Sequence, residues 1–328
     1  MNNNIRNQET VCAVVVTYNR KNLLLECLEA IKKQTKPVDA IYLIDNASTD
    51  GTPELLMEKG YISELPPQEL KELWEKEFEI NNLVDGRSIK LYYVRMHENT
   101  GGAGGFYEGL KRAYEKGYDW FWLMDDDVEP LGHALETQLR YKDISECIHP
   151  SKVYLDGSRF LWEGQICEQT GFEVFFGDEF LKNKEWTTVN FGCFEGMLIS
   201  RNVVAKISYP DKRLFIVGDD TYYGYLASKH TNNIYISSVC FIKKIDKRLA
   251  THSRLSFYLY GRNIIGYVAR KIARDKFAYL LVATYKLFRH SIGILIKRKG
   301  LIKVYDLWRG YIDGLLERWG EEREYFKR

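Results

Sequence analysis

The 328-residue sequence lacks the patterns that define several large classes of proteins. It has no Cys-x-x-Cys pair and no Cys/His cluster, so we expect neither a zinc site nor a disulfide framework, and a reducing cytoplasm fits its six scattered cysteines. No signal-peptide core follows Met1. The longest late apolar stretch, Phe277 to Phe288, is broken by Lys286 and is too short to span a bilayer. We therefore expect a cytoplasmic protein without a spanning segment.

An excess of one charge is also missing, because the formal net charge is only +2. The whole molecule is therefore not expected to bind nucleic acid. Between Arg262 and Arg309, however, there are twelve basic residues and only two acids. Basic residues interleaved with apolar and aromatic ones are typical of helices that lie at an anionic membrane surface. We expect peripheral contact with the inner face of the cell membrane; a helical domain packed on the rest of the protein, or a contact in a homo-oligomer, is the alternative.

Short apolar runs alternate with helical patterns in the first half of the chain, which predicts parallel strands and crossover helices. The acidic stretch Glu64–Asn81 has a helical pattern and is interpreted as an inserted surface helix or hairpin. The sequence favours an α/β protein in three parts, with boundaries at 1–130, 131–252 and 253–328. The strands expected in the first part are Val11–Val16, Ala40–Ile44, Ile89–Met96 and Trp120–Met124, and the helices are Leu23–Gln34 and Phe106–Lys116.

Three adjacent carboxylates, Asp125, Asp126 and Asp127, directly follow an apolar strand. Adjacent negative charges repel one another and resist burial, so a strand end of this kind favours a bound Mn²⁺ or Mg²⁺ ion over a solvated acidic turn. Alternate residues of an extended segment point the same way, so Asp125 and Asp127 should converge while Asp126 turns aside.

Small polar residues and glycines follow the other expected strands, at Thr17–Arg20, Asp45–Thr52 and Asn99–Gly105. They leave backbone groups free to approach a base, a ribose or an anion, and Asp45 could accept a hydrogen bond from a pyrimidine imide. Taken singly, the segments after the first two strands are better explained as a plain turn with a helix cap. The glycine cluster is not a Walker loop, because no Gly-Lys-Ser/Thr follows it, and it does not sit on the first strand as a dinucleotide fingerprint would.

Together, these segments resemble family 2 glycosyltransferases of the GT-A fold, and in particular the branch of bacterial galactofuranosyltransferases and rhamnosyltransferases. The resemblance covers about Val11 to Asn263. It implies a GT-A nucleotide-binding fold, with a mostly parallel central sheet flanked by helices, followed by a C-terminal helical region. It also implies an inverting transferase that uses a UDP- or dTDP-sugar and a divalent metal. The motifs that carry the resemblance are Val14–Arg20, Asp45–Thr52, Asn99–Phe106 and Leu123–Pro130.

The same resemblance assigns roles to individual residues. Family members often have a metal-binding histidine shortly after the strand expected at Asn233–Ile242, where this chain has Lys243 and Lys244. The nearest histidine is His252, which is a displaced ligand or a polar packing residue. The resemblance assigns nucleotide-sugar binding to Thr17, Asn19, Arg20, Asp45, Asn99, Gly102, Asp125 and Asp126, and metal binding to Asp125, Asp127 and His252.

An acidic pair, Asp219-Asp220, opens a helical pattern farther along the chain. Helix capping alone explains acids in such a position. In the resembled family a loop of this type carries the general base, usually the second acid, so Asp220 is the predicted base and Asp219 its support or substitute. Glu195 is interpreted either as a contact to a sugar hydroxyl or as a structural acid.

The glycine cluster is more similar to that of the galactofuranosyl group than to that of the rhamnosyl group. The favoured reaction is therefore transfer of galactofuranose from UDP-galactofuranose to a hydroxyl of a glycan or polyprenyl-diphosphate-linked acceptor in bacterial polysaccharide synthesis. Rhamnosyl transfer from dTDP-rhamnose is the first alternative. A sugar-phosphate nucleotidyltransferase is disfavoured because no Gly-rich basic loop follows the first strand, and a silent binding protein of the same fold is the third interpretation.

Overall fold

The central strand of the protein, β1 (Val11–Thr17), lies between β2 (Ala40–Asp45) and β5 (Trp120–Asp125) and is parallel to both. The next strand, β4 (Ser88–Arg95), is parallel to β2. Because β1, β2 and β5 are parallel, their carboxyl ends lie at one edge of the sheet. The strand order reverses at β1, and ligands collect at the carboxyl edge beside such a reversal. The structure is a computed structural model that describes residues 9–175, 183–245, 253–297, 300–320, 322 and 325.

Further strands extend the sheet on both sides, in the order β11-β13-β7-β12-β5-β1-β2-β4-β3. Most of their pairings are antiparallel, while β7 and β13 run parallel. Two short strands, β6 and β8, pair with β13 and β7, and β9 and β10 form a separate hairpin. These strands are β3 (Trp74–Asn81), β6 (Val128–Pro130), β7 (Cys147–Tyr154), β8 (Arg159–Phe160), β9 (Gly164–Cys167), β10 (Phe172–Phe175), β11 (Trp186–Thr188), β12 (Met197–Ser200) and β13 (Ile234–Lys243).

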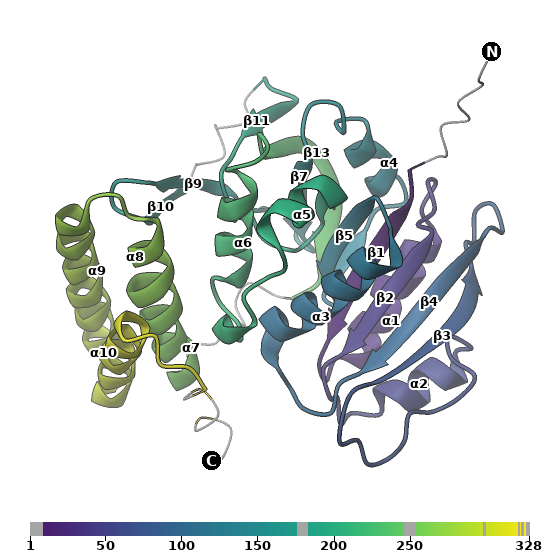
Figure 1. The fold of residues 1–328 in the computed structure, drawn as a ribbon, viewed down its shortest axis with the longest axis horizontal. Coiled ribbons are helices and arrows are strands. Elements are labelled where there is room, and N and C mark those ends of the chain that lie inside the picture. Colours follow the sequence, from purple (N-terminus) through teal and green to yellow (C-terminus); the bar gives the residue numbers. More distant parts are fainter. Residues whose placement is uncertain are drawn as a thin grey trace.

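Helices cover both faces of this sheet (Figure 1). Val11, Ala13 and Val15 of β1 belong to the same buried cluster as the apolar face of α1, whereas Val14 and Val16 belong to the cluster built around α3. This two-sided burial explains why β1 is a continuous apolar run instead of an alternating one. The helices of this part are α1 (Lys21–Lys32), α2 (Thr52–Glu58), α3 (Gly101–Lys116), α4 (Ala134–Leu139), α5 (Arg201–Ile207), the 3₁₀ turn η2 (Lys212–Leu214) and α6 (Asp219–Ala227).

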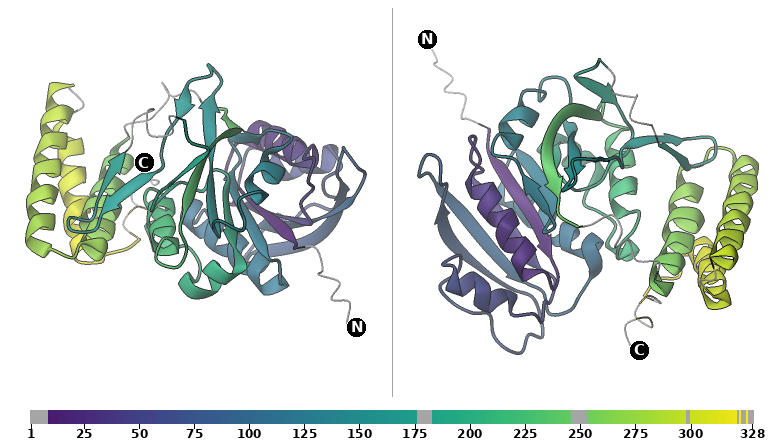
Figure 2. Two further views of the ribbon diagram at one scale, coloured as in Figure 1. Left: turned by 90° about the horizontal axis from the view of Figure 1, so that it is seen from above. Right: turned by 180° about the vertical axis from the view of Figure 1, so that it is seen from behind.

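The C-terminal helices form a group at the end of the molecule opposite β3, as Figures 1 and 2 show from three sides. The π-helical segment η4 and helix α10 approach closely, since a Cβ on Gly314 would lie 2.2 Å from the carbonyl oxygen of Arg262. No helix in the described part of the chain is long and apolar enough to cross a membrane. The helices are α7 (Arg254–Leu259), η4 (Tyr260–Val268), α8 (Ala269–Ile272), α9 (Lys276–Ile296) and α10 (Leu301–Leu315).

The strands and helices predicted for the first half are confirmed, with two differences. Helix α3 begins at Gly101, inside the glycine cluster, whereas the sequence pattern placed its start at Phe106. Of the two interpretations of Glu64–Asn81, the helix is wrong and the hairpin is correct, because Trp74–Asn81 forms β3 antiparallel to β4. From Glu77 on, exposed residues of β3 alternate with buried or half-buried ones at a period of two, so the acidic composition concealed an edge strand. The boundaries of the three predicted parts stay a prediction.

Candidate functional site

Asp126 points back to the end of β1. Its Oδ2 accepts a hydrogen bond from Thr17 Oγ1 at 2.7 Å, and its Oδ1 lies 3.2 Å from Arg20 Nη1. The same guanidinium nitrogen is 2.8 Å from Asp127 Oδ2. Burial raises the pKa of Asp126 to about 6, although the charge of Arg20 and the hydrogen bond from Thr17 act in the opposite direction. Thr17 and Arg20 thus meet the acid run directly.

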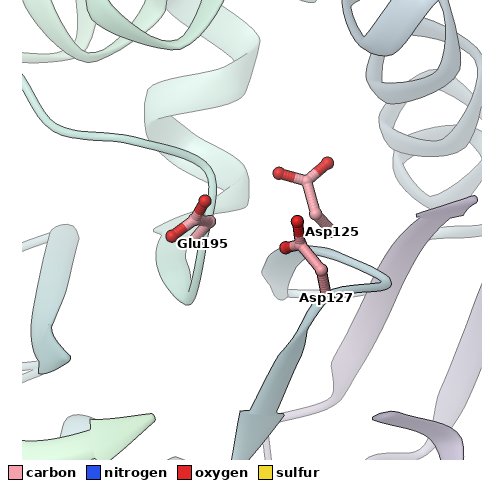
Figure 3. A group of neighbouring side chains, drawn as sticks. All are labelled: Asp125, Asp127 and Glu195. Atoms are coloured by element: carbon pink, nitrogen blue, oxygen red, sulfur yellow. The ribbon is translucent and has the colours of Figure 1, made fainter. Parts of the chain in front are cut away.

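Asp125 and Asp127 turn to the other side, where they meet Glu195 from the loop before β12 (Figure 3). One carboxylate oxygen from each of the three lies within 4.8 Å of the others. Glu195 Oε2 is buried and has no hydrogen-bond partner among the described residues. Burial, followed by the charge of Asp127, raises the pKa of Asp125 well above its usual range, and burial also raises the pKa of Glu195. We call these three residues the acidic cluster.

Lys243, the last residue of β13, contacts two members of this cluster. Its Nζ lies 2.8 Å from Asp127 Oδ1 and also donates to Glu195 Oε1. The pairing of β13 with β6 sets Lys243 opposite Val128, directly after the acid run. Burial opposes the charge on Lys243, but Glu195 and Asp127 outweigh it and raise the pKa of the ammonium group. Lys243 therefore stays protonated.

The charges around the cluster fit a divalent cation. Four carboxylates are joined there, those of the acidic cluster and Asp126, and two described cationic side chains, Arg20 and Lys243, contact them. When all four acids are ionised, two negative charges remain without a partner. The unpartnered Glu195 Oε2 and the carboxylate of Asp125 are oxygen ligands of the type that Mg²⁺ and Mn²⁺ prefer. The residues present therefore fit such an ion.

Asp219 and Asp220, the acidic pair predicted to provide the general base, occupy the first turn of α6. Asp219 is only 6% exposed, whereas Asp220 is more accessible and its Oδ1 accepts a hydrogen bond from the backbone N–H of Thr221 at 2.6 Å. Burial raises the pKa of Asp219 to about 6. Burial and the charge of Asp219 raise the pKa of Asp220 further, and Glu195 adds to that increase. The pair and the acidic cluster therefore share one electrostatic environment.

The glycine-rich start of α3 lies beside this pair. A Cβ added to Gly102 would point at Asp219, 4.0 Å from its Oδ2. The segment is anchored by Asn46, whose Nδ2 donates to the carbonyl oxygen of Gly101 at 2.8 Å and whose Oδ1 accepts from the N–H of Thr100. Asn99 Oδ1 accepts from the N–H of Gly101 at 2.8 Å, so it caps this turn. Gly102 is thus placed next to Asp219, the neighbour of the candidate base.

Asp45, the last residue of β2, and Asn19, in the turn after β1, have partners within the protein. Asp45 is fully buried; its Oδ2 accepts from Tyr93 Oη at 2.7 Å and from Arg95. Asn19 Oδ1 accepts from the N–H of Thr49 at 2.6 Å. Their assignment to nucleotide binding stays a prediction, and the contacts described here organise the turn.

Most of the site residues that the sequence predicted lie at this edge of the sheet. The structure brings together Asp125, Asp127 and Glu195, and the charge of Glu195 acts on the pKa of Asp220, while His252 lies outside the described residues. Asn46 escaped sequence reasoning because an asparagine in a turn carries no distinctive signal. The sequence assigned Glu195 only to a contact with a sugar hydroxyl or to a structural role. It marked Lys243 only as a residue that stands where family members often have a metal-binding histidine.

Comparison with known proteins decides the family. Residues 12–60 and 77–208, more than half of the chain, match the family model described as glycosyl transferase family 2. The chain belongs to this family. It is 28% identical over 220 residues to galactofuranosyltransferase GlfT1 of Mycolicibacterium smegmatis, which covers 65% of this chain and 63% of that protein. It is also 28% identical over 231 residues to GlfT1 of Mycobacterium tuberculosis (strain H37Rv), with 65% and 62% covered. The chain thus spans less than two thirds of these relatives.

Solved structures of similar fold confirm the predicted GT-A architecture. S. aureus TarS 1–349 in complex with UDP-GlcNAc matches with a TM-score of 0.57 and 14% identity, covering 94% of this chain and 82% of that one. The mannosyltransferase PcManGT from Pyrobaculum calidifontis, in complex with GDP-Man and Mn²⁺, matches with a TM-score of 0.53 and 16% identity, covering 95% and 88%. At these identities the likeness establishes the fold alone.

Proposed function

We propose that this glycosyl transferase family 2 member moves a sugar from a nucleotide diphosphate to a hydroxyl group with the help of Mn²⁺ or Mg²⁺. The observation that carries the proposal is the acidic cluster, whose uncompensated charge at the carboxyl edge of the sheet lies in the same electrostatic environment as Asp219-Asp220. In the family context, the solved neighbours bound to UDP-GlcNAc or to GDP-Man with Mn²⁺ support a nucleotide-sugar and a cation at this edge.

The proposed reaction is a single displacement with inversion at the anomeric carbon. Asp220 accepts the proton of the acceptor hydroxyl, the acceptor oxygen forms a bond to the anomeric carbon, and the bond to the diphosphate breaks on the opposite face. Asp219 supports Asp220, since its negative charge raises the pKa of that neighbour and strengthens it as a base. Asp125 and Asp127 would hold a divalent cation, which would supply positive charge to neutralise the leaving diphosphate.

The donor we favour is UDP-galactofuranose. The sequence relationship to GlfT1 supports this choice, as does the glycine-rich segment that the structure places beside Asp219. Transfer from dTDP-rhamnose is the alternative donor reaction. Both use the same displacement, so the distinction depends on contacts to the base and to the sugar ring.

The acceptor we favour is lipid-linked, and two features of the C-terminal helices support it. A cavity of about 790 Å³ lies between the β9–β10 hairpin and the C-terminal helices, and Val217, two residues before Asp219, lines it together with Ile264. Arg289 of α9 and Lys297, directly after that helix, also line it and could meet a phosphate group. A second face of α9 carries exposed apolar side chains. Such a combination suits an amphipathic acceptor at a membrane surface.

The decisive experiment is a donor panel. Purified protein should be incubated with UDP-galactofuranose, other UDP-sugars, dTDP-rhamnose and Mn²⁺, and release of nucleoside diphosphate should be measured. We expect hydrolysis of UDP-galactofuranose that stops on chelation of the metal and in the Asp127→Ala variant. If the protein hydrolyses only dTDP-rhamnose, the donor is dTDP-rhamnose and the protein is a rhamnosyltransferase. Pyrophosphate release from a nucleoside triphosphate, or donor binding with no turnover, would contradict glycosyl transfer.

A further inference from the structure

Lys243 is placed at the acidic cluster by the backbone. β13 pairs antiparallel with β6 so that Lys243 lies opposite Val128, and the N–H of Lys244 donates to the carbonyl oxygen of Asp127 at 2.8 Å. The side chain of Lys243 is 12% exposed, and its Nζ bridges Asp127 Oδ1 and Glu195 Oε1. Strand pairing therefore fixes an ammonium group among the residues that suit a divalent cation.

This ammonium group competes with a cation for ligands. It occupies one oxygen of Asp127 and one of Glu195, while Arg20 occupies the other oxygen of Asp127. The carboxylate of Asp125 and the unpartnered Oε2 of Glu195 remain. Mg²⁺ and Mn²⁺ take about six oxygen ligands, and substrate phosphates commonly supply part of that set. With few carboxylate oxygens left and a positive charge beside them, the protein alone is a poor cation site.

The same ammonium group favours a diphosphate. An anionic ligand that approaches Asp125, Asp126, Asp127 and Glu195 meets four negative charges, against which Lys243 and Arg20 are the described cationic groups in contact. The next buried lysine, Lys152, is already paired with Glu163. Removing Lys243 would therefore leave the diphosphate facing a more negative site.

We propose that Lys243 is a fixed counter-charge that weakens divalent-cation binding to the free protein and strengthens binding of a nucleoside diphosphate. The protein then takes up the metal and the diphosphate together, since each supplies what the other lacks at the acidic cluster. This inference rests on the proposed function only in taking a nucleoside diphosphate as the second ligand.

The neighbouring residue provides a matched control. Lys244 points away from the cluster, and its Nζ lies 2.8 Å from both Glu26 and Glu129. Lys243→Met and Lys244→Met remove the same charge from adjacent positions on opposite sides of one strand end. Lys243→Gln serves as a second variant of the test position, and thermal melting shows that each protein is folded.

The test measures binding of MnCl₂ by the electron paramagnetic resonance signal of the free ion, with and without UDP, and binding of UDP alone by calorimetry. For Lys243→Met we expect Mn²⁺ affinity without UDP to rise at least tenfold, and UDP affinity without metal to fall at least fivefold. Lys244→Met should stay within twofold of wild type in both measurements. Opposite shifts for two ligands do not arise from general loss of structure.

Unchanged or weaker Mn²⁺ binding in folded Lys243→Met and Lys243→Gln would overturn the proposal, because Lys243 would then only hold the carboxylates in place. Equal shifts in the Lys244→Met protein would also overturn it, because they would reflect overall charge. Failure of the proposed function would show differently: wild-type protein would hydrolyse no nucleotide-sugar in the donor panel, whatever the variants do with Mn²⁺.

Discussion

Asn263 of η4 holds the loop in front of the candidate base, because its Nδ2 lies 2.8 Å from the carbonyl oxygen of Val217. The same nitrogen is within 2.9 Å of the carbonyl oxygens of Leu214 and Ile216. Val217 has a φ of +74°, a conformation that a β-branched residue adopts only when its surroundings impose it. The C-terminal helices therefore shape the loop that leads into Asp219.

Replacing Asn263 by Ala should release this loop. The carbonyl oxygens of Ile216 and Val217 would lose this side-chain donor, which we expect to cost about 1–3 kcal/mol of unfolding free energy. Because the strained turn at Val217 would relax, we expect the transfer rate to fall at least tenfold while donor affinity changes less than twofold. Chemical denaturation and separate measurement of kcat and KM check this. Asn202→Ala, which removes an exposed hydrogen bond to Glu146, should leave both unchanged.

Replacing Asp220 by Asn should remove the proton acceptor. A positioned general base contributes about 10²- to 10⁴-fold to rate, so transfer should fall by that order while donor binding persists. Since the charge of Asp219 raises the pKa of Asp220, Asp219→Asn should shift the acidic limb of the rate profile to lower pH. Rates measured across pH check both variants. A near-normal rate in Asp220→Asn would place the base elsewhere.

Asp219 should also lower stability at neutral pH. Its pKa is about 6 in the folded protein against an ordinary 3.8, so the folded state keeps a proton that the unfolded state loses between those values. Stability from this group therefore falls as pH rises from 3.8 to 6 and stays low above 6. Without ligands, Asp219→Asn should be more stable than wild type at pH 7.5, by up to about 3 kcal/mol.

Denaturation of both proteins between pH 4.5 and 7.5 measures this difference. The advantage of Asp219→Asn should shrink toward the acidic end of the range. Asp143→Asn, which changes an exposed acid, should show no such trend. An advantage that is the same at every pH would contradict the assignment of the effect to the proton on Asp219.

The sequence predicted the parts of the site that depend on local periodicity. Asp125 and Asp127 meet while Asp126 turns to Thr17 because side chains alternate at a strand end, which the sequence shows directly. Lys243 reaches Asp127 only through the register of β13 on β6, across a separation of 116 residues. No local pattern encodes that register, so the ammonium group in the cluster could not be foreseen.

The surroundings of Asp45, at the end of β2, also depend on contacts that no local sequence pattern encodes. The turn after β2 was predicted correctly, but the burial of Asp45 depends on Tyr93 and Arg95, which β4 brings beside it. The helical pattern in Glu64–Asn81 failed because an edge strand with one solvated face accepts many charges. Contacts between distant strands decided both outcomes.

Two adjacent glycines should respond differently to the same methyl group. Gly101 has a φ of +73°, and a Cβ there would lie 2.0 Å from the carbonyl oxygen of Phe215, so Gly101→Ala should lower the melting temperature by several degrees. A Cβ on Gly102 meets only Asp219 Oδ2, at 4.0 Å. Gly102→Ala should therefore fold normally but reduce transfer, since the methyl group enters the space beside Asp219, which supports the candidate base. Equal melting losses in both variants would contradict this geometry.

The exposed apolar face of α9 should bind membranes. Phe288 is 56% exposed and Ile292 is 55% exposed, and α9 contains no acidic residue while Lys286 and Arg289 lie beside them. An apolar side chain buried in a membrane contributes about 1.5–3 kcal/mol, so replacing both by Ser should weaken vesicle binding at least tenfold. Co-sedimentation with anionic and with neutral vesicles measures this, and wild-type protein should prefer the anionic ones. Leu155→Ser, at a 66% exposed residue outside the C-terminal helices, is the matched control and should bind as wild type does.

One outcome would contradict membrane binding by this face of α9. If wild-type protein does not bind anionic vesicles but self-associates, and the double variant is monomeric, the face is a contact between copies of the chain. Its apolar area would then be covered by protein.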